Sequence, residues 1–255
     1  MGQAGQVGEV EVLRAPAKLT RSLRLVGVRP DGYHLMDAEM VTLDLADRLL
    51  VAEGDGLAVE GPFAAQVPTG DDNLVRRALA AVGRRAAVVL DKRIPPGAGL
   101  GGGSADAAAV LRWAGCSDAS LAAGIGSDVP FCLVGGRARV GGAGERVFPL
   151  EPVAACFLVL VPPARLDTAS VYRAWDRLGG PEGANGNDLE PAALALVPEL
   201  AAWRDRLGEL TGLTPRLAGS GSAWFVEGPK PFSGLAGELV HDGGVGLLVA
   251  CRTSC

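Results

Sequence analysis

A run of glycines ahead of a helix is the segment of this 255-residue chain best suited to chemistry. Residues 92–109 read KRIPPGAGLGGGSADAAA, and five of the seven residues from Gly97 to Gly103 are glycines. Glycine lets the backbone approach a ligand closely, and the free N–H groups at a helix start attract anions. The segment is therefore suited to cradling a polyphosphate, and the hydroxyl of Ser104 could bind phosphate or Mg²⁺.

Other interpretations of the same glycines are weaker. Gly97, Gly99 and Gly102 satisfy G-x-G-x-x-G, but six residues separate them from the preceding expected strand, and strands and helices do not alternate as in a dinucleotide fold. No Gly-Lys-Ser/Thr sequence closes the loop as in a Walker motif. A flexible loop without a ligand is the simplest alternative.

Lysine is scarce in this chain, with three lysines against 21 arginines. Lysine offers a compact ammonium where arginine offers a planar fork, so a chain this rich in arginine keeps lysine where a point charge is wanted. The three positions are Lys18, Lys92 and Lys230. Taken alone, Lys18 would be interpreted as a solvated strand residue and Asp128 as a turn residue.

Three segments resemble the motifs of the GHMP kinases and occur in the order typical of that family. Residues 15–19 (APAKL) are similar to its N-terminal motif and residues 95–109 (PPGAGLGGGSADAAA) to its second. Residues 217–225 (LAGSGSAWF) are similar to its third, glycine-rich motif. The resemblance spans nearly the whole chain and implies an ATP-dependent small-molecule kinase.

Three shorter segments indicate one branch of that family. Residues 29–34 (RPDGYH), 126–131 (GSDVPF) and 187–190 (NDLE) are similar to segments of the 4-diphosphocytidyl-2-C-methyl-D-erythritol kinases. Their resemblance implies transfer of the γ-phosphate of ATP to the 2-hydroxyl of the methylerythritol moiety, a step of non-mevalonate isoprenoid biosynthesis. Another GHMP kinase with a different alcohol acceptor, or a catalytically silent nucleotide-binding relative, stays open as an alternative.

The resemblance also implies roles in phosphoryl transfer. Asp128 would accept or orient the proton of the acceptor hydroxyl, and Lys18 would lie between Asp128 and the γ-phosphate. Asn73 and Lys92 would lie near the adenosine, and Mg²⁺ would accompany ATP beside Ser104. The phosphates of ATP would lie against Pro95, Pro96, Gly97, Ala98, Gly99, Leu100, Gly101, Gly102, Gly103 and Ser104.

The acceptor side is implied in the same way. Tyr33 and Tyr172, the only tyrosines of the chain, would stack on cytosine, and His34 would hydrogen-bond the edge of the base. Thr20 and Thr168 complete the implied substrate-binding set. Each tyrosine by itself is also compatible with packing in a core or at a rim.

The chain departs from the family pattern at two places. Thr20 follows APAKL where asparagine is usual, and threonine lacks the reach of the amide. The segment from Trp113 to Gly126 is shorter than the usual helical connection, and a missing helical turn would shift Asp128. Either change could mark an altered substrate or a weakened enzyme.

The hydrophobic pattern predicts an α+β protein. Strands are expected over residues 7–13, 23–28, 36–43, 49–51, 86–90, 156–163, 224–226 and 245–251, with two more within 131–149; helices are expected over 72–85, 105–113, 120–125, 169–178, 187–210 and 232–241. With the resemblance, the pattern predicts a two-domain GHMP kinase fold. Residues 1–153 would form a ribosomal-protein-like β-α-β nucleotide domain with the ATP phosphates and catalytic residues. Residues 154–255 would form a ferredoxin-like α/β domain on the substrate side.

Composition limits the partners. The formal net charge of −5 disfavours nucleic acid and anionic membranes, because both require a basic face. Five scattered cysteines without a C-x-x-C pair indicate neither a disulfide framework nor a zinc site. No apolar run has transmembrane length, and the N-terminus has no signal-peptide core. We expect a cytoplasmic monomer or homodimer with a small-molecule substrate, a cytidine diphosphate derivative.

Overall fold

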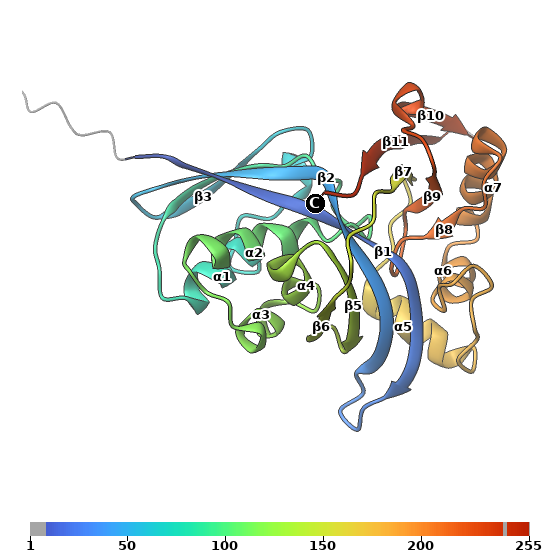
Figure 1. Ribbon diagram of the computed structural model, residues 1–255, viewed down its shortest axis with the longest axis horizontal. Helices are drawn as coiled ribbons and strands as arrows, with labels where there is room; N and C mark the ends of the chain where they lie inside the picture. Colours follow the sequence, from blue (N-terminus) through green and yellow to red (C-terminus); the bar gives the residue numbers. More distant parts are fainter. Residues whose placement is uncertain (1–8, 242–243, 255) are drawn as a thin grey trace, which may run out of the picture.

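The computed structural model describes residues 9–241 and 244–254, and it has two β-sheets flanked by helices (Figure 1). The expectations for the first eight residues, including the start of the strand at 7–13 and the absence of a signal peptide, lie outside the described residues. The first sheet has the order β3-β4-β2-β5-β6, with β1 paired to β2. Its strands are β1 (Glu11–Val28), β2 (His34–Ala52), β3 (Gly56–Glu60), β4 (Ala87–Asp91), β5 (Arg137–Gly142) and β6 (Arg146–Pro149).

Strands β1 and β2 form one long antiparallel hairpin. We predicted two separate strands within each of them, and the structure has one continuous strand in each place. The pairing register shifts at three points, between residues 16 and 18, 20 and 22, and 25 and 27. Such irregularities break the alternation of apolar side chains without ending a strand, which explains the wrong prediction. The hairpin carries Lys18 and Thr20 near its middle and Tyr33 and His34 at its tip.

Four helices gather on one side of this sheet (Figure 1). Every residue of α2 from Ala105 to Leu111 is buried, and the alanines allow close packing against neighbouring elements. The two strands predicted within 131–149 are present as β5 and β6, but the first begins only at Arg137, because residues 129–134 form a short helix with Pro130 in its first turn, where proline is favourable. The helices are α1 (Leu74–Ala81), α2 (Gly102–Trp113), α3 (Ala119–Ile125) and α4 (Val129–Val134).

The second sheet is antiparallel, with the order β10-β11-β7-β9-β8. Its four strands β11-β7-β9-β8 have the ferredoxin-like order. Helices α5 (Thr168–Arg177), α6 (Glu190–Leu196) and α7 (Leu200–Thr211) lie between β7 and β8 in the chain. The strands are β7 (Cys156–Val161), β8 (Arg216–Leu217), β9 (Trp224–Gly228), β10 (Gly237–His241) and β11 (Gly244–Arg252).

Two helix predictions in this half are wrong. The helix expected over 187–210 is divided into α6 and α7 just before Pro198, since a proline disfavours helical backbone in the residue that precedes it. The helix expected over 232–241 is a short 3₁₀ turn, Ser233–Leu235, followed by strand β10. Residues 229–237 contain two prolines and two glycines, which oppose a helix. Within the described part of the chain, no helix is both long and apolar enough to span a bilayer.

A shared apolar core joins the two sheets. It includes Ala17, Leu19, Val41 and Leu43 from the long hairpin, Phe157, Val159 and Phe225 from the second sheet, and Leu100 and Ala218 from the glycine segments. The glycine segments therefore lie between the sheets. The change from one sheet to the other falls between Pro149 and Cys156, and a domain boundary near residue 154 stays a prediction.

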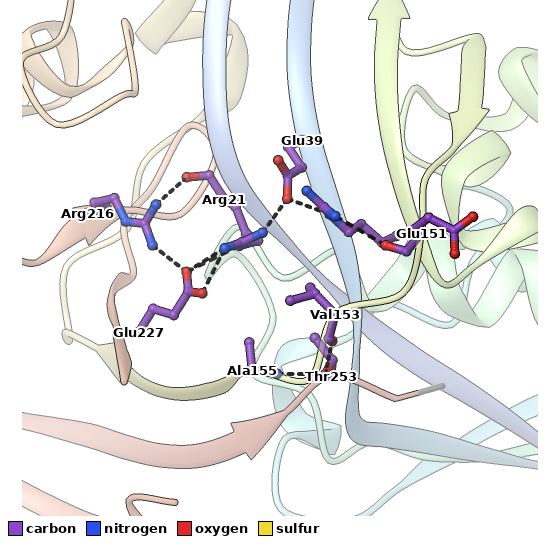
Figure 2. A network of polar contacts seen from close by, with 9 residues as sticks. Arg21, Glu39, Glu151, Val153, Ala155, Arg216, Glu227 and Thr253 are labelled. Carbon is purple, nitrogen blue, oxygen red and sulfur yellow. Dashed lines mark hydrogen bonds and ion pairs between the residues drawn. The ribbon is translucent and has the colours of Figure 1, made fainter. Parts of the chain in front are cut away.

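Figure 2 shows a polar network that also bridges the sheets. Arg21 of β1 donates hydrogen bonds to Glu39 of β2 and to Glu227 of β9, with 2.7 Å between Arg21 Nη2 and Glu227 Oε1. Arg137 binds Glu39 at 2.9 Å, and Arg216 binds Glu227 at 2.8 Å. Burial opposes ionisation of Glu39, but the two guanidiniums lower its pKa. Each carboxylate is thus held by two arginines.

We expect the substitution Glu227→Gln to lower the free energy of unfolding by about 1–3 kcal/mol, because it removes the anion paired with Arg216 and one of the two anions paired with Arg21, both partly buried. Urea denaturation would measure the change. Glu209→Gln is the matched control, since Glu209 forms an exposed pair with Arg206 on α7, and its loss should be below about 0.5 kcal/mol. Equal losses in the two variants would contradict a bridging role for the network.

Candidate active site

Two glycine-containing motif segments, residues 95–109 and 217–225, meet around the side chain of Lys18, which belongs to the first motif segment and is 4% exposed. The backbone N–H of Lys18 donates to the carbonyl of Leu100 at 3.0 Å. A Cβ atom on Gly101 would lie 2.7 Å from Cγ of Lys18, and one on Gly219 would lie 3.6 Å from Nζ. Residues far apart in the sequence thus enclose one ammonium group.

The second and third motif segments touch through their backbones. A Cβ atom on Gly99 would lie 2.2 Å from the carbonyl oxygen of Ala218, so only glycine fits there. The side chain of Asn187 holds the third segment by donating to the carbonyls of Leu217 and Gly219, at 2.9 and 2.7 Å. The NDLE segment therefore has a structural role in placing the third glycine segment.

Lys18 holds a carboxylate and a hydroxyl. Its Nζ lies 3.1 Å from Oδ2 of Asp128 and donates to Oγ1 of Thr20, also at 3.1 Å. Asp128 stands at the start of α4, where its side chain forms no capping hydrogen bond. The short segment from Trp113 to Gly126 therefore does not keep Asp128 from Lys18. Thr20, in place of asparagine, positions the ammonium.

The start of α2 is open to an anion. Gly101, with φ +66°, precedes the helix, and no side chain caps the first-turn N–H groups. We expected the glycines to make room for a ligand, but several make room for the protein. A Cβ on Gly102 would lie 2.8 Å from Nζ of Lys92, and those on Gly99 and Gly101 would meet Ala218 and Lys18. The glycines thus allow the loop to pack tightly, and its N–H groups can still bind phosphate.

A cavity of about 680 Å³ connects Lys18 and Asp128 to the residues predicted to bind cytidine. Of the predicted residues, Lys18, Asp128, Thr20, Tyr33, His34, Thr168, Tyr172 and Gly99 line it. The lining also includes four residues that were not predicted from the sequence, Ser127, Arg173, Asp176 and Ser220. Helical spacing could have found Asp176, because it follows Tyr172 by four residues and so shares its face of α5.

Comparison with known proteins decides the family. Residues 73–136 match the family model described as GHMP kinases N terminal domain. A 4-diphosphocytidyl-2-C-methyl-D-erythritol kinase of Cereibacter sphaeroides is 39% identical over 241 residues, covering 83% of this chain and 87% of the relative. The enzyme of that name from Pelotomaculum thermopropionicum is 42% identical over 251 residues, covering 83% and 86%. The chain belongs to the 4-diphosphocytidyl-2-C-methyl-D-erythritol kinase family.

Solved structures agree with this family. The crystal structure of a 4-(cytidine 5'-diphospho)-2C-methyl-D-erythritol kinase matches with a TM-score of 0.73 and 33% identity, over 96% of this chain and 100% of that one. A homoserine kinase from Cytophaga hutchinsonii, 18% identical, has a TM-score of 0.57 over 89% and 87% of the two chains and shares the fold. The predicted α+β GHMP kinase fold is confirmed.

Within this kinase family fold, the residues predicted to hold cytosine lie at the tip of the long hairpin and on α5. The rings of His34 and Tyr172 are 4.9 Å apart between centroids. Tyr33 is 64% exposed at the tip. Burial raises the pKa of Tyr172 to about 12, which keeps its hydroxyl neutral. The hydroxyl of Thr168 lies 3.0 Å from that of Ser220. Stacking on cytosine stays a prediction.

Two residues predicted near the adenosine have other partners. Lys92 is 2% exposed, and its Nζ lies 2.5 Å from Asp47 and 2.7 Å from Asp106. Asn73 caps α1 by accepting from the N–H of Val75 at 2.9 Å, and it donates to the carbonyl of Pro68 at 2.7 Å. Both side chains thus support the loops beside α2, and their predicted place near the adenosine stays a prediction.

The proline end of the glycine segment also lies apart from the large cavity. Pro95, Pro96, Gly97 and Ala98 line a second cavity of about 260 Å³, together with residues of β11 and the turn after β7. Gly99 is therefore the point at which the segment reaches the catalytic side. The predicted phosphate contacts of residues 95–98 stay predictions.

Lys92 forms a buried triad with Asp47 and Asp106 beneath the glycine loop. Asp47 also accepts from the backbone N–H groups of Arg93 and Ile94, at 2.5 and 2.7 Å, and so fixes the start of the loop. Oδ1 of Asp106 has no hydrogen-bond partner among the described residues. Burial raises the pKa of Asp106 to about 7, although Lys92 opposes the shift. The triad therefore holds a proton on Asp106 under mildly acidic conditions.

Protonation of Asp106 predicts that the stability of the protein depends on pH. The pKa of Asp106 is raised in the folded state, to about 7, so the folded protein binds a proton that the unfolded chain releases near pH 4. Asp106 therefore contributes most to stability at low pH, and the contribution is lost as pH rises toward and through 7.

We expect the unfolding free energy of the wild type, relative to Asp106→Asn, to fall steadily from about pH 4 to pH 8. Urea denaturation at several pH values would measure it. The exposed Asp205 of α7 gives the control variant Asp205→Asn, whose difference from the wild type should stay flat over the same range. A difference that rises with pH would contradict the protonated triad.

Proposed function

We propose that this chain transfers the γ-phosphate of ATP to the 2-hydroxyl of 4-diphosphocytidyl-2-C-methyl-D-erythritol. One observation carries the proposal: a single cavity is lined by the Lys18–Asp128 pair and by His34 and Tyr172. The first pair suits phosphoryl transfer and the second suits recognition of a base. The net charge of −5 supports an enzyme without a nucleic-acid or anionic-membrane partner, and the scattered cysteines support a cytoplasmic location. We also propose that it acts as a monomer or homodimer.

Asp128 and Lys18 divide the work of the transfer. The acceptor oxygen forms a bond to the γ-phosphorus while the bond from that phosphorus to the bridging oxygen of ADP breaks, and the hydroxyl proton passes to the carboxylate of Asp128. Lys18 lies 3.1 Å from Oδ2 of Asp128, so its charge holds the carboxylate and faces the transferring phosphoryl group. Thr20 keeps the ammonium from turning away.

The start of α2 suits the phosphates of ATP. Its uncapped N–H groups and the positive end of the helix would bind phosphate oxygens. In residues 9–241 and 244–254, no group of three or more His, Cys, Asp or Glu residues could hold a metal ion. We therefore assign Mg²⁺ to the phosphates themselves, with the hydroxyl of Ser104 as its protein ligand. The ion would offset the charge of the phosphates.

Release of ADP, measured by a coupled assay, tests the proposal. We expect turnover with 4-diphosphocytidyl-2-C-methyl-D-erythritol and little with homoserine or mevalonate. Asp128→Asn should lower kcat by about 10²–10³ and leave ATP affinity nearly unchanged. The exposed Asp55 provides the control Asp55→Asn. A preference for another alcohol would overturn the substrate assignment, and an Asp128→Asn variant with more than a third of the wild-type kcat would remove Asp128 from the mechanism.

The enclosure of Lys18 by glycine makes a second prediction. Gly101→Ala would place Cβ 2.7 Å from Cγ of Lys18 and would strain a backbone with φ +66°, so we expect kcat to fall at least about tenfold as Lys18 shifts. Gly83→Ala is the matched control, because Gly83 has φ +63° and nothing within 4 Å of the added Cβ. That variant should share the strain and keep kcat. Equal kcat values in the two variants would contradict the role of Gly101.

A further inference from the structure

The imidazole of His34 is surrounded by three side chains from one helix. Nε2 of His34 lies 2.8 Å from Oδ1 of Asp176. The ring of Tyr172 is 4.9 Å away and that of Trp175 is 5.6 Å away, measured between centroids. Helix α5 supplies all three side chains, and the His34 side chain is largely buried among them. The orientation of the imidazole is thus set from the other half of the fold.

The contact with Asp176 determines which ring nitrogen carries the proton. An ionised carboxylate only accepts hydrogen bonds, so Nε2 of the neutral ring must be the donor. Nδ1 is then left unprotonated, as an acceptor. In the part of the chain that the structure describes, no protein group pairs with Nδ1. His34 lines the large cavity, so Nδ1 is the ring nitrogen available to a ligand.

An acceptor nitrogen distinguishes the two pyrimidines. Cytosine has an amino group at its 4-position, which donates, and uracil has a carbonyl there, which accepts. An amine facing Nδ1 forms a hydrogen bond, whereas a carbonyl facing Nδ1 leaves two acceptors opposed and unpaired. A protonated Nδ1 would reverse the preference. The base that the cavity prefers therefore depends on the tautomer of His34.

We propose that Asp176 is a positioning residue that selects cytosine over uracil by fixing the tautomer of His34. The inference rests on the proposed function, because it takes the cavity to hold a cytidine diphosphate derivative. Asp176 is 47% exposed on its side chain, and exposed ion pairs contribute little to stability. The carboxylate is therefore not needed to hold α5 in place, and its effect is on the ligand.

The substitution Asp176→Asn tests the proposal. An asparagine amide can donate to Nε2, which would leave the proton on Nδ1. We expect the wild type to bind CDP more tightly than UDP in calorimetry, and the ratio of their Kd values to shrink about tenfold or more in Asp176→Asn. The KM for ATP should change little. Asp176→Glu, which keeps an acceptor-only group, should retain most of the discrimination.

Two further measurements separate positioning from a structural role. The chain has only two histidines, His34 and His241, so two-bond ¹H–¹⁵N correlations would assign the tautomer of His34. We expect protonation at Nε2 in the wild type and a population shift toward Nδ1 in Asp176→Asn. In a His34→Ala background, Asp176→Asn should have no further effect on the CDP to UDP ratio, since it acts through the imidazole.

The outcomes distinguish the two proposals. A wild type that neither binds CDP nor phosphorylates the cytidine substrate would overturn the proposed function. A wild type that prefers CDP, with the same preference in a folded Asp176→Asn variant, would overturn the role of Asp176 alone. Asp205→Asn, the same chemical change on an exposed part of α7, should leave the ratio of Kd values unchanged. Loss of discrimination in both Asp176→Asn and Asp205→Asn would also overturn the role of Asp176.

Discussion

Burial of the ammonium group of Lys18 is the constraint on which the site depends. A buried charge needs partners, and Asp128 and Thr20 both lie 3.1 Å from its nitrogen. The side chain of Lys18 must also be closely surrounded, and the backbones of Gly101 and Gly219 can approach it because neither residue has a side chain. The long hairpin, the glycine loop, the third glycine segment and the start of α4 therefore have to meet at one point. The shared core between the two sheets follows from that meeting.

Much of this site could be predicted, because its motifs are continuous in the sequence. The glycine run before α2, the isolated Lys18 and the aspartate before Val-Pro each carry a local signal, and the structure brings them together. The purpose of the glycines could not be predicted. Whether a missing Cβ serves a ligand or a neighbouring backbone depends on contacts such as that of Gly99 with Ala218, which joins segments more than a hundred residues apart.

Side-chain partners were the weakest part of the prediction. Lys92 and Asn73 belong to segments near the expected nucleotide site, yet Asp47, Asp106 and a helix cap hold their polar groups. Asp176 has no motif around it; its helical spacing from Tyr172 places it on the same face of α5, but its contact with His34 becomes visible only in the structure. In the fold, interruptions of alternation in β1 and β2 suggested turns where the strands only bulge, and β10 replaced an expected helix.

The long hairpin has a consequence for the size of molecule that the kinase accepts. Lys18, beside the reacting phosphate in the proposed mechanism, and His34, beside the base, belong to the same pair of strands. The number of hairpin residues between Lys18 and His34 therefore sets the distance between the two ends of the acceptor site. Hinge motion between the sheets would leave that distance almost unchanged. The length of the hairpin therefore limits the length of the acceptor, and insertion or deletion of a residue pair in the hairpin would change that limit.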